Sequence, residues 1–182
     1  MGKTKRYALT GGPGSGKSSI LRALEYDWGE GVIREAAEDV IALMKAQGDP
    51  APWEREDFQD RILELQWKRE EDAEKMAKNG RIFVDRGLLD GLAYYQLQGR
   101  RPSEGMKAVQ RYMKNVRPYE KAFLVENLGN CEKTGIRREE MSEALELEKL
   151  QEQNYREAGC EVIKIPSTTL AERVDKVMRS LK

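Results

Sequence analysis

The sequence contains no histidine and only two cysteines among its 182 residues. Without histidine the chain cannot build a histidine-based catalytic triad, a zinc hydrolase site or a histidine-ligated iron centre. The two cysteines, Cys131 and Cys160, are too few for a disulfide framework. Acid–base chemistry in this protein must therefore come from carboxylates, lysine, tyrosine or water.

Long apolar runs and a net charge are also missing. No run of about 18 apolar residues occurs, and the basic start of the chain is not followed by the apolar segment of a signal peptide. We therefore expect a soluble, cytoplasmic protein without a membrane span. The 32 basic residues balance the 32 acidic ones, which argues against general nucleic-acid binding, because such domains are usually basic.

The chain is rich in charge instead. Charged residues make up 35% of the sequence, whereas about 25% is usual, and 39% of the residues are hydrophobic. This length predicts a single domain over residues 1–182 that folds without a disulfide framework or a structural metal. The dense charge at 54–79 and 137–157 is most simply explained as the solvated side of surface helices.

Hydrophobic periodicity predicts short strands that alternate with helices. The strands are expected at 6–10, 32–33, 81–85, 121–125 and 161–165. Helical patterns follow the first strand and then cover about 37–44, 54–79, 88–98, 103–115, 139–158 and 170–181. This alternation predicts an α/β fold with a parallel sheet covered by helices on both faces.

The strongest motif follows the first predicted strand. Residues 11–18 fit G-x-x-x-x-G-K-[ST], the Walker A motif or P-loop, between a predicted strand and a predicted helix. Glycines let backbone N–H groups approach phosphate oxygens, Lys17 can reach the β- and γ-phosphates, and the Ser18 hydroxyl can ligate Mg²⁺. The predicted phosphate-binding residues are Gly11, Gly12, Pro13, Gly14, Ser15, Gly16, Lys17, Ser18 and Ser19.

A P-loop predicts nucleoside triphosphate binding but leaves the reaction open. The sequence contains no Asn-Lys-x-Asp motif for reading guanine and no ABC-type signature, and it leaves no room for the helical lid domain of ring-forming AAA+ machines. These features favour a small-molecule phosphotransferase.

Asp85 and Arg86 directly follow the predicted strand 81–85. Ligands of open α/β sheets bind at the carboxyl ends of the strands, so Asp85 can hold Mg²⁺ or accept a proton from an attacking hydroxyl. The planar guanidinium of Arg86 suits bidentate phosphate contacts. The alternative is that Asp85 caps the following helix and that Arg86 is a surface charge.

Glu35 stands at the end of the second predicted strand, where it could act as the general base for an acceptor hydroxyl. The alternative is a first-turn charge that complements a helix dipole. Trp53 follows Pro50 and Pro52 in an expected loop, and its ring is a candidate for stacking on an acceptor.

Two further segments are candidates for nucleotide contacts. Arg137 and Arg138 lie in the stretch 127–140, which we interpret as a lid that closes over the triphosphate; the alternative is an exposed pair at a helix start. Thr168, in the turn after the last strand, could border the adenine ring.

Several motifs occur in one order along nearly the whole chain. They are Thr10 to Ser19, Glu35-Ala36-Ala37, Asp85-Arg86-Gly87, Gly135-Ile136-Arg137-Arg138-Glu139 and Tyr155-Arg156-Glu157-Ala158-Gly159 before Val162-Ile163-Lys164-Ile165-Pro166. In this combination the chain resembles the AAA_28 family of NadR/Ttd14-like ATPases and kinases.

The resemblance implies a three-layer nucleoside/nucleotide-kinase-like P-loop fold with a five-stranded parallel sheet of order 2-3-1-4-5. It also implies ATP and Mg²⁺ as cofactors, with Ser18 and Asp85 at the metal and with Arg137 and Arg138 in the lid. It leaves the acceptor open, since the relatives include a ribosylnicotinamide kinase domain.

Two functional hypotheses follow. The first is an ATP- and Mg²⁺-dependent kinase that phosphorylates a small metabolite, such as a nucleoside or nucleotide, with Lys17, Asp85, Glu35, Arg137 and Arg138 as catalytic residues. The second is a regulatory ATPase or GTPase whose nucleotide state controls the binding of a protein or lipid partner.

Overall fold

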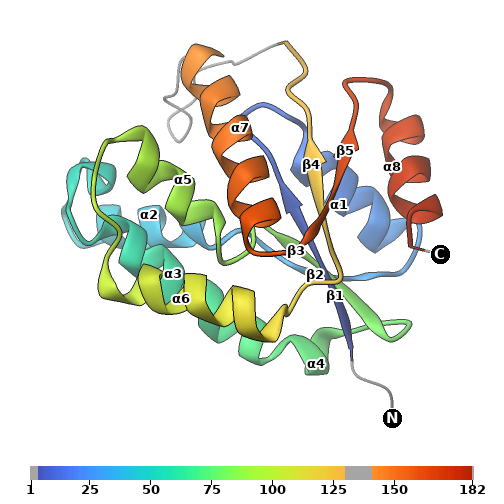
Figure 1. The fold of residues 1–182 in the computed structure, drawn as a ribbon, viewed down its shortest axis with the longest axis horizontal. Helices are drawn as coiled ribbons and strands as arrows, with labels where there is room; N and C mark the ends of the chain where they lie inside the picture. Colours follow the sequence, from blue (N-terminus) through green and yellow to red (C-terminus); the bar gives the residue numbers. More distant parts are fainter. Residues whose placement is uncertain (1–3, 130–140, 182) are drawn as a thin grey trace.

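The computed structural model describes residues 4–129 and 141–181, which form a five-stranded sheet with helices on both faces (Figure 1). The strands are β1 (Lys5–Thr10), β2 (Gly31–Ile33), β3 (Arg81–Asp85), β4 (Lys121–Val125) and β5 (Glu161–Ile165). The helices are α1 (Lys17–Tyr26), α2 (Ala36–Ala46), α3 (Phe58–Glu71), α4 (Ala73–Met76), α5 (Asp90–Leu97), α6 (Glu104–Val116), α7 (Met141–Glu157) and α8 (Leu170–Arg179), with a 3-10 turn η1 (Pro52–Glu54).

The sheet order is β2-β3-β1-β4-β5, and every pair of neighbouring strands is parallel, which confirms the expected fold class. Strand β1 therefore lies in the centre, between β3 and β4. The chain leaves β1 toward one edge of the sheet and leaves β3 toward the other. This reversal is the topological switch at which open α/β sheets bind ligands, and it lies where β1 and β3 end.

Side chains of the central strands alternate between two cores. On one face Tyr7, Leu9 and Phe83 pack beneath α1 and α8. On the other face Ala8 and Val84 pack against side chains of α5, α6 and α7. The sheet is buried on both sides, as the apolar strand sequences predicted.

A third, smaller apolar cluster joins α2, η1 and α3. It contains Val40, Ile41, Met44 and Phe58, and Trp53 packs against it. These elements lie together beside the sheet, away from α1 and α8 (Figure 1). They form a separate wall that faces the carboxyl edge of the sheet.

The prediction of a single helix at 54–79 is wrong, because this range contains the end of η1 and, as separate elements, α3 and α4. The chain is extended at Arg55, so η1 and α3 are separate, and α3 ends before Asp72. Asn79 and Gly80 both have positive φ and form a tight turn in which Lys78 pairs with Arg81, instead of capping a helix. The carbonyl of Met76, at the end of α4, lies so close to Gly31 that a Cβ on that glycine would collide with it, so this part of the chain packs against β2.

Among residues 4–129 and 141–181, no helix is both long and apolar enough to cross a membrane.

Candidate active site

The P-loop connects β1 to α1 at the carboxyl edge of the sheet. Gly14 and Gly16 have φ values of 78° and 86°, a region that L side chains disfavour. A Cβ at Gly11 would collide with the carbonyl of Val125, and one at Gly12 would lie 2.5 Å from the carbonyl oxygen of Ala144 in α7. Backbone conformation and close packing thus both require glycine here.

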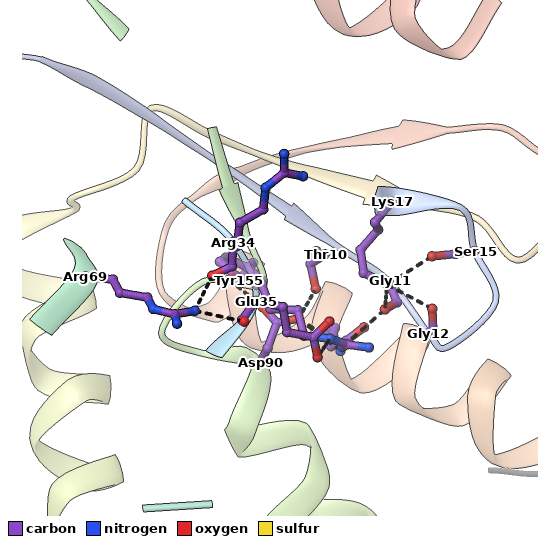
Figure 2. Close-up of polar contacts among 12 residues, drawn as sticks. Thr10, Gly11, Gly12, Ser15, Lys17, Arg34, Glu35, Arg69, Asp90 and Tyr155 are labelled. Carbon is purple, nitrogen blue, oxygen red and sulfur yellow. Dashed lines mark hydrogen bonds and ion pairs between the residues drawn. The ribbon is translucent and has the colours of Figure 1, made fainter. Parts of the chain in front are cut away.

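Lys17 is buried within this loop. Its Nζ donates hydrogen bonds to the carbonyl oxygens of Gly11 (2.8 Å) and Gly12 (3.0 Å) and to Ser15 Oγ (3.2 Å), as Figure 2 shows. Burial lowers the pKa of Lys17, the Arg86 guanidinium lowers it further, and nearby carboxylates oppose this shift. An anion that reached the loop would therefore stabilise the charged ammonium.

A cavity of about 660 Å³ opens beside the P-loop. One wall is the loop itself and the first turn of α1, and it includes Lys17, Ser18 and Ser19. The facing wall comes from α2, η1, α3 and α5. The cavity therefore joins the phosphate-binding motif to a region large enough for a second small molecule.

The facing wall combines aliphatic side chains with aromatic and amide groups, and these aromatic and amide groups can recognise a ligand. Trp53, Phe58 and Tyr94 supply rings, and the cavity-lining amides include Gln59 and Gln66. Trp53 belongs to η1 instead of an irregular loop, and Lys45 Nζ lies 5.2 Å from its ring centroid.

Asp85 ends β3 and is 3% exposed. Burial raises its pKa, Glu35 adds to this, and Lys17 opposes it. Its Oδ1 has no hydrogen-bond partner within the described part of the chain, and Asp85 is not among the residues that line the cavity. A buried carboxylate oxygen without a partner suits a cation or a water of its hydration shell.

Because the buried Oδ1 of Asp85 lacks a partner among the described residues, the residues present fit a bound Mg²⁺. Mg²⁺ is usually held by one or two protein oxygens together with phosphates and waters. The Ser18 hydroxyl at the cavity wall and the Asp85 carboxylate would be those protein ligands. No group of three His, Cys, Asp or Glu side chains is placed to hold a metal among the described residues, so phosphates and waters would complete the coordination.

Arg86 and Glu35 meet at the cavity wall. Arg86 Nε lies 2.8 Å from Glu35 Oε1 as an ion pair without hydrogen-bond alignment, and Arg86 Nη1 lies 3.6 Å from Asp90 Oδ1. Arg86 Nη1 also donates to the Gly11 carbonyl (3.4 Å). Burial disfavours the charged guanidinium, but Glu35 and the other nearby groups outweigh it and raise the pKa of Arg86 well above its usual value. Arg86 thus links the P-loop to Glu35.

The backbone at Glu35 is held from α3. Arg69 Nη1 donates to the carbonyl oxygens of Arg34 (3.0 Å) and Glu35 (2.9 Å), as Figure 2 shows. Glu35 occupies the N-cap position of α2, yet its side chain makes no capping hydrogen bond. The carboxylate is directed to Arg86 instead.

Sequence reasoning missed Asp90, which is buried at the start of α5. Asp90 Oδ1 accepts hydrogen bonds from Thr10 Oγ1 (2.8 Å) and Gln151 Nε2 (3.1 Å), and Oδ2 accepts one from Tyr155 OH (2.8 Å) (Figure 2). Burial raises its pKa, whereas Arg86 lowers it. The only signal in the sequence for Asp90 as a buried hydrogen-bond acceptor was its position a few residues after the Asp85-Arg86 pair.

Two more missed residues hold the P-loop from behind. Arg173 of α8 donates from Nη1 to the Ser15 carbonyl (2.8 Å) and from Nη2 to the Glu126 carbonyl (2.8 Å), and Asn127 Nδ2 donates to the Pro13 carbonyl (2.9 Å). An arginine on the apolar stripe of the last helix was the available signal for Arg173. Asn127 carried no signal of its own.

Three other predicted residues remain to be placed. Arg137 and Arg138, with most of the expected lid at 127–140, lie outside the described residues. Thr168 is exposed in the turn between β5 and α8 and does not line the cavity.

Comparisons with solved structures give the same fold. A deoxyadenosine kinase from M. mycoides, with the products dCMP and dCDP bound, has a TM-score of 0.65 at 17% identity, covering 97% of this chain and 98% of that one. The same kinase with dATP has a TM-score of 0.59 at 16% identity, again covering 97% of this chain and 98% of that one.

The NadR protein in complex with NR has a TM-score of 0.69 at 16% identity. The match covers 97% of this chain but 50% of the NadR chain, so this protein spans half of that length. No curated protein matches the sequence. The family model AAA_28, described as an AAA domain, matches residues 6–173. On the strength of a match over most of its length, the chain belongs to the AAA_28 family.

Proposed function

We propose that the protein is an ATP- and Mg²⁺-dependent kinase that transfers the γ-phosphoryl group to a hydroxyl of a nucleoside or closely related metabolite. The observation that carries this proposal is the continuous cavity of about 660 Å³, with a P-loop on one side and an aromatic and amide wall on the other. Glu35 and Arg86 lie between these two sides.

In this reaction the acceptor hydroxyl oxygen attacks the γ-phosphorus, the bond to the β–γ bridging oxygen breaks, and ADP leaves. The residues of the P-loop, Gly11 to Ser19, bind the phosphates, and Lys17 neutralises charge on the β- and γ-phosphates. Glu35 accepts the hydroxyl proton as general base. Arg86, held between Glu35 and Gly11, contacts the transferring group.

Ser18 and Asp85 would hold Mg²⁺, which when bound supplies charge neutralisation at the phosphate oxygens. Arg137 and Arg138 would close over the triphosphate from the lid, and Thr168 would border the adenine ring. Closure excludes water and so favours transfer to the acceptor over hydrolysis.

The charge of the cavity favours an acceptor without a phosphate. Within the described residues, Lys17 and Arg86 are the cations that line it, and Arg86 already pairs with Glu35 and Asp90. Glu38 adds a further acidic group to the wall. The carboxylates of the wall would repel a phosphate group on the acceptor, whereas they would not repel a neutral or cationic nucleoside.

The aromatic and amide wall suits a heterocyclic base. Phe58 and Tyr94 offer ring faces for stacking, and the buried Gln59 amide offers a donor and an acceptor to a base edge. The deoxyadenosine kinase and NadR structures support a nucleoside-type acceptor, because they carry the same fold with nucleotides or NR bound.

A labelled-ATP assay tests the proposal. The full chain is incubated with Mg²⁺, ATP and a panel of purine, pyrimidine and pyridine nucleosides, together with their 5′-monophosphates. We expect transfer to at least one nucleoside, with kcat/KM at least tenfold above that of its monophosphate. Steady hydrolysis with no transfer would overturn the kinase and favour the regulatory ATPase or GTPase.

Glu35→Gln tests the general base. We expect kcat to fall by about a hundredfold, because positioned acid–base groups contribute on that order, while the Kd for an ATP analogue changes less than about threefold. Glu64→Gln is the matched control, since Glu64 is an exposed glutamate of α3. An equal loss in both variants would remove Glu35 from the mechanism.

A further inference from the structure

The turn that carries Arg86 has an unfavourable local conformation. Arg86 has φ 58°, in the left-handed region that is unfavourable for a residue other than glycine. Its backbone N–H donates to the Leu9 carbonyl (3.0 Å), and the Asp90 N–H donates to the Gly87 carbonyl (3.0 Å). Contacts from the surrounding structure must therefore hold the turn in place.

Two buried tyrosine hydroxyls supply such contacts. A Cβ added at Gly87 would collide with Tyr155 OH and would lie 2.8 Å from Tyr119 OH, so both hydroxyls lie directly against this residue. Tyr119 OH also accepts a hydrogen bond from the Leu88 N–H (2.9 Å). Tyr119 precedes β4 and Tyr155 lies in α7, so distant segments of the chain converge on one turn.

A buried carboxylate orients each hydroxyl. Tyr119 OH donates to Glu70 Oε1 (2.7 Å), and Tyr155 OH donates to Asp90 Oδ2 (2.8 Å). Burial, with these carboxylates, raises the pKa of both tyrosines well above the usual value, so both phenols remain protonated donors. With its proton directed to Glu70, Tyr119 presents a lone pair to Leu88.

The Tyr119 branch extends to the cavity. Gln66 Nε2 donates to Glu70 Oε1 (3.0 Å), and Gln66 lines the same cavity as Arg86. One hydrogen-bonded series therefore runs from the cavity wall through Glu70 and Tyr119 to the backbone of the Arg86 turn. A fully satisfied buried network of this kind selects one conformation.

We propose that Tyr119 and Tyr155 are positioning residues that hold the Arg86–Leu88 turn, and with it the Arg86 guanidinium, against Glu35. This inference deepens the proposed function, on which its kinetic consequence rests. Neither tyrosine is required to touch a substrate. Both act through the backbone and side chain of Arg86.

Tyr119→Phe and Tyr155→Phe each remove one hydroxyl and keep the ring. We expect kcat to fall at least tenfold in each variant, while the Kd for a Mg²⁺–ATP analogue changes less than threefold, because neither hydroxyl contacts the P-loop. The matched control is Tyr95→Phe, since Tyr95 is also buried and donates to a carboxylate, Asp60 Oδ1 (3.2 Å), away from this turn. A loss of kcat in Tyr95→Phe as large as in the two test variants would refute the positioning role.

A second experiment does not depend on activity. Gly87→Ala is introduced into the wild type and into Tyr155→Phe, and the unfolding equilibrium of all four proteins is measured in urea. If the Tyr155 hydroxyl holds Gly87, removing it relieves the closest contact that a Cβ at Gly87 would make. Gly87→Ala should then raise the unfolding equilibrium constant by a factor at least tenfold smaller in Tyr155→Phe than in the wild type. Equal effects in both backgrounds would overturn the proposal. A wild type that phosphorylates no acceptor would instead refute the proposed function, and the Gly87 cycle would still decide the positioning role.

Discussion

The buried carboxylate of Glu70 makes a quantitative prediction about stability and pH. Glu70 is 2% exposed, and burial raises its pKa from 4.5 to about 7, against the lowering effect of Gln66, Tyr119 and the more distant Arg6. The folded state therefore binds a proton between pH 4.5 and 7 that the unfolded state has released. Stability then decreases as pH rises through this range and becomes constant above it.

The size of this effect follows from the pKa. A shift from 4.5 to about 7 corresponds to about 3 kcal/mol of unfolding free energy, at about 1.4 kcal/mol per pKa unit. Glu70→Gln is neutral at every pH and keeps an acceptor for the Tyr119 hydroxyl. The variant should match the wild type near pH 4.5 and exceed it by about 3 kcal/mol near pH 8.

Urea denaturation of both proteins between pH 4.5 and 8 gives the difference directly, and other titrating groups largely cancel in it. The control is Glu64→Gln, which should show no such trend because Glu64 is exposed on the same helix. A difference between Glu70→Gln and wild type that stays constant with pH would show that Glu70 has an ordinary pKa.

Three further predictions concern the P-loop and its support. Because the pKa of Lys17 is lowered to about 8, nucleotide binding at pH 8 should take up about half a proton, and calorimetry in buffers of different ionisation enthalpy measures this. Arg173→Met removes two charge-assisted hydrogen bonds to backbone carbonyls and should lower stability by about 2–3 kcal/mol in thermal denaturation, whereas Arg179→Met should change it little. Asp85→Asn should weaken the Mg²⁺ dependence of nucleotide binding in calorimetry with and without the metal, and an unchanged dependence would exclude Asp85 as a ligand.

The sheet could be predicted because its signals are local. Apolar strands, the glycine-rich loop and the Asp85-Arg86 strand end each occupy a few consecutive residues, and their order implies the parallel arrangement. The carboxyl ends of parallel strands share one edge of the sheet, and Lys17 and Arg86, each predicted to contact phosphate, lie near each other at that edge.

The features of the fold and of the site that the sequence did not predict depend on contacts between residues far apart in the chain. Helix α3 ends at Glu71, and the segment that follows it packs against Gly31 of β2, a long-range contact that no local pattern within 54–79 indicates. Asp90 is recognisable only once Thr10 and Tyr155 are brought to it from other elements. Such residues carry no motif of their own.

Helix α7 contacts both halves of the proposed site. Near its first turn, the carbonyl of Ala144 packs against Gly12, and near its last turn Tyr155 bonds to Asp90. A helix is stiff along its axis, so a displacement of either end is transmitted to the other. The affinities for nucleotide and acceptor should therefore depend on each other, each ligand altering the binding of the other by the same factor.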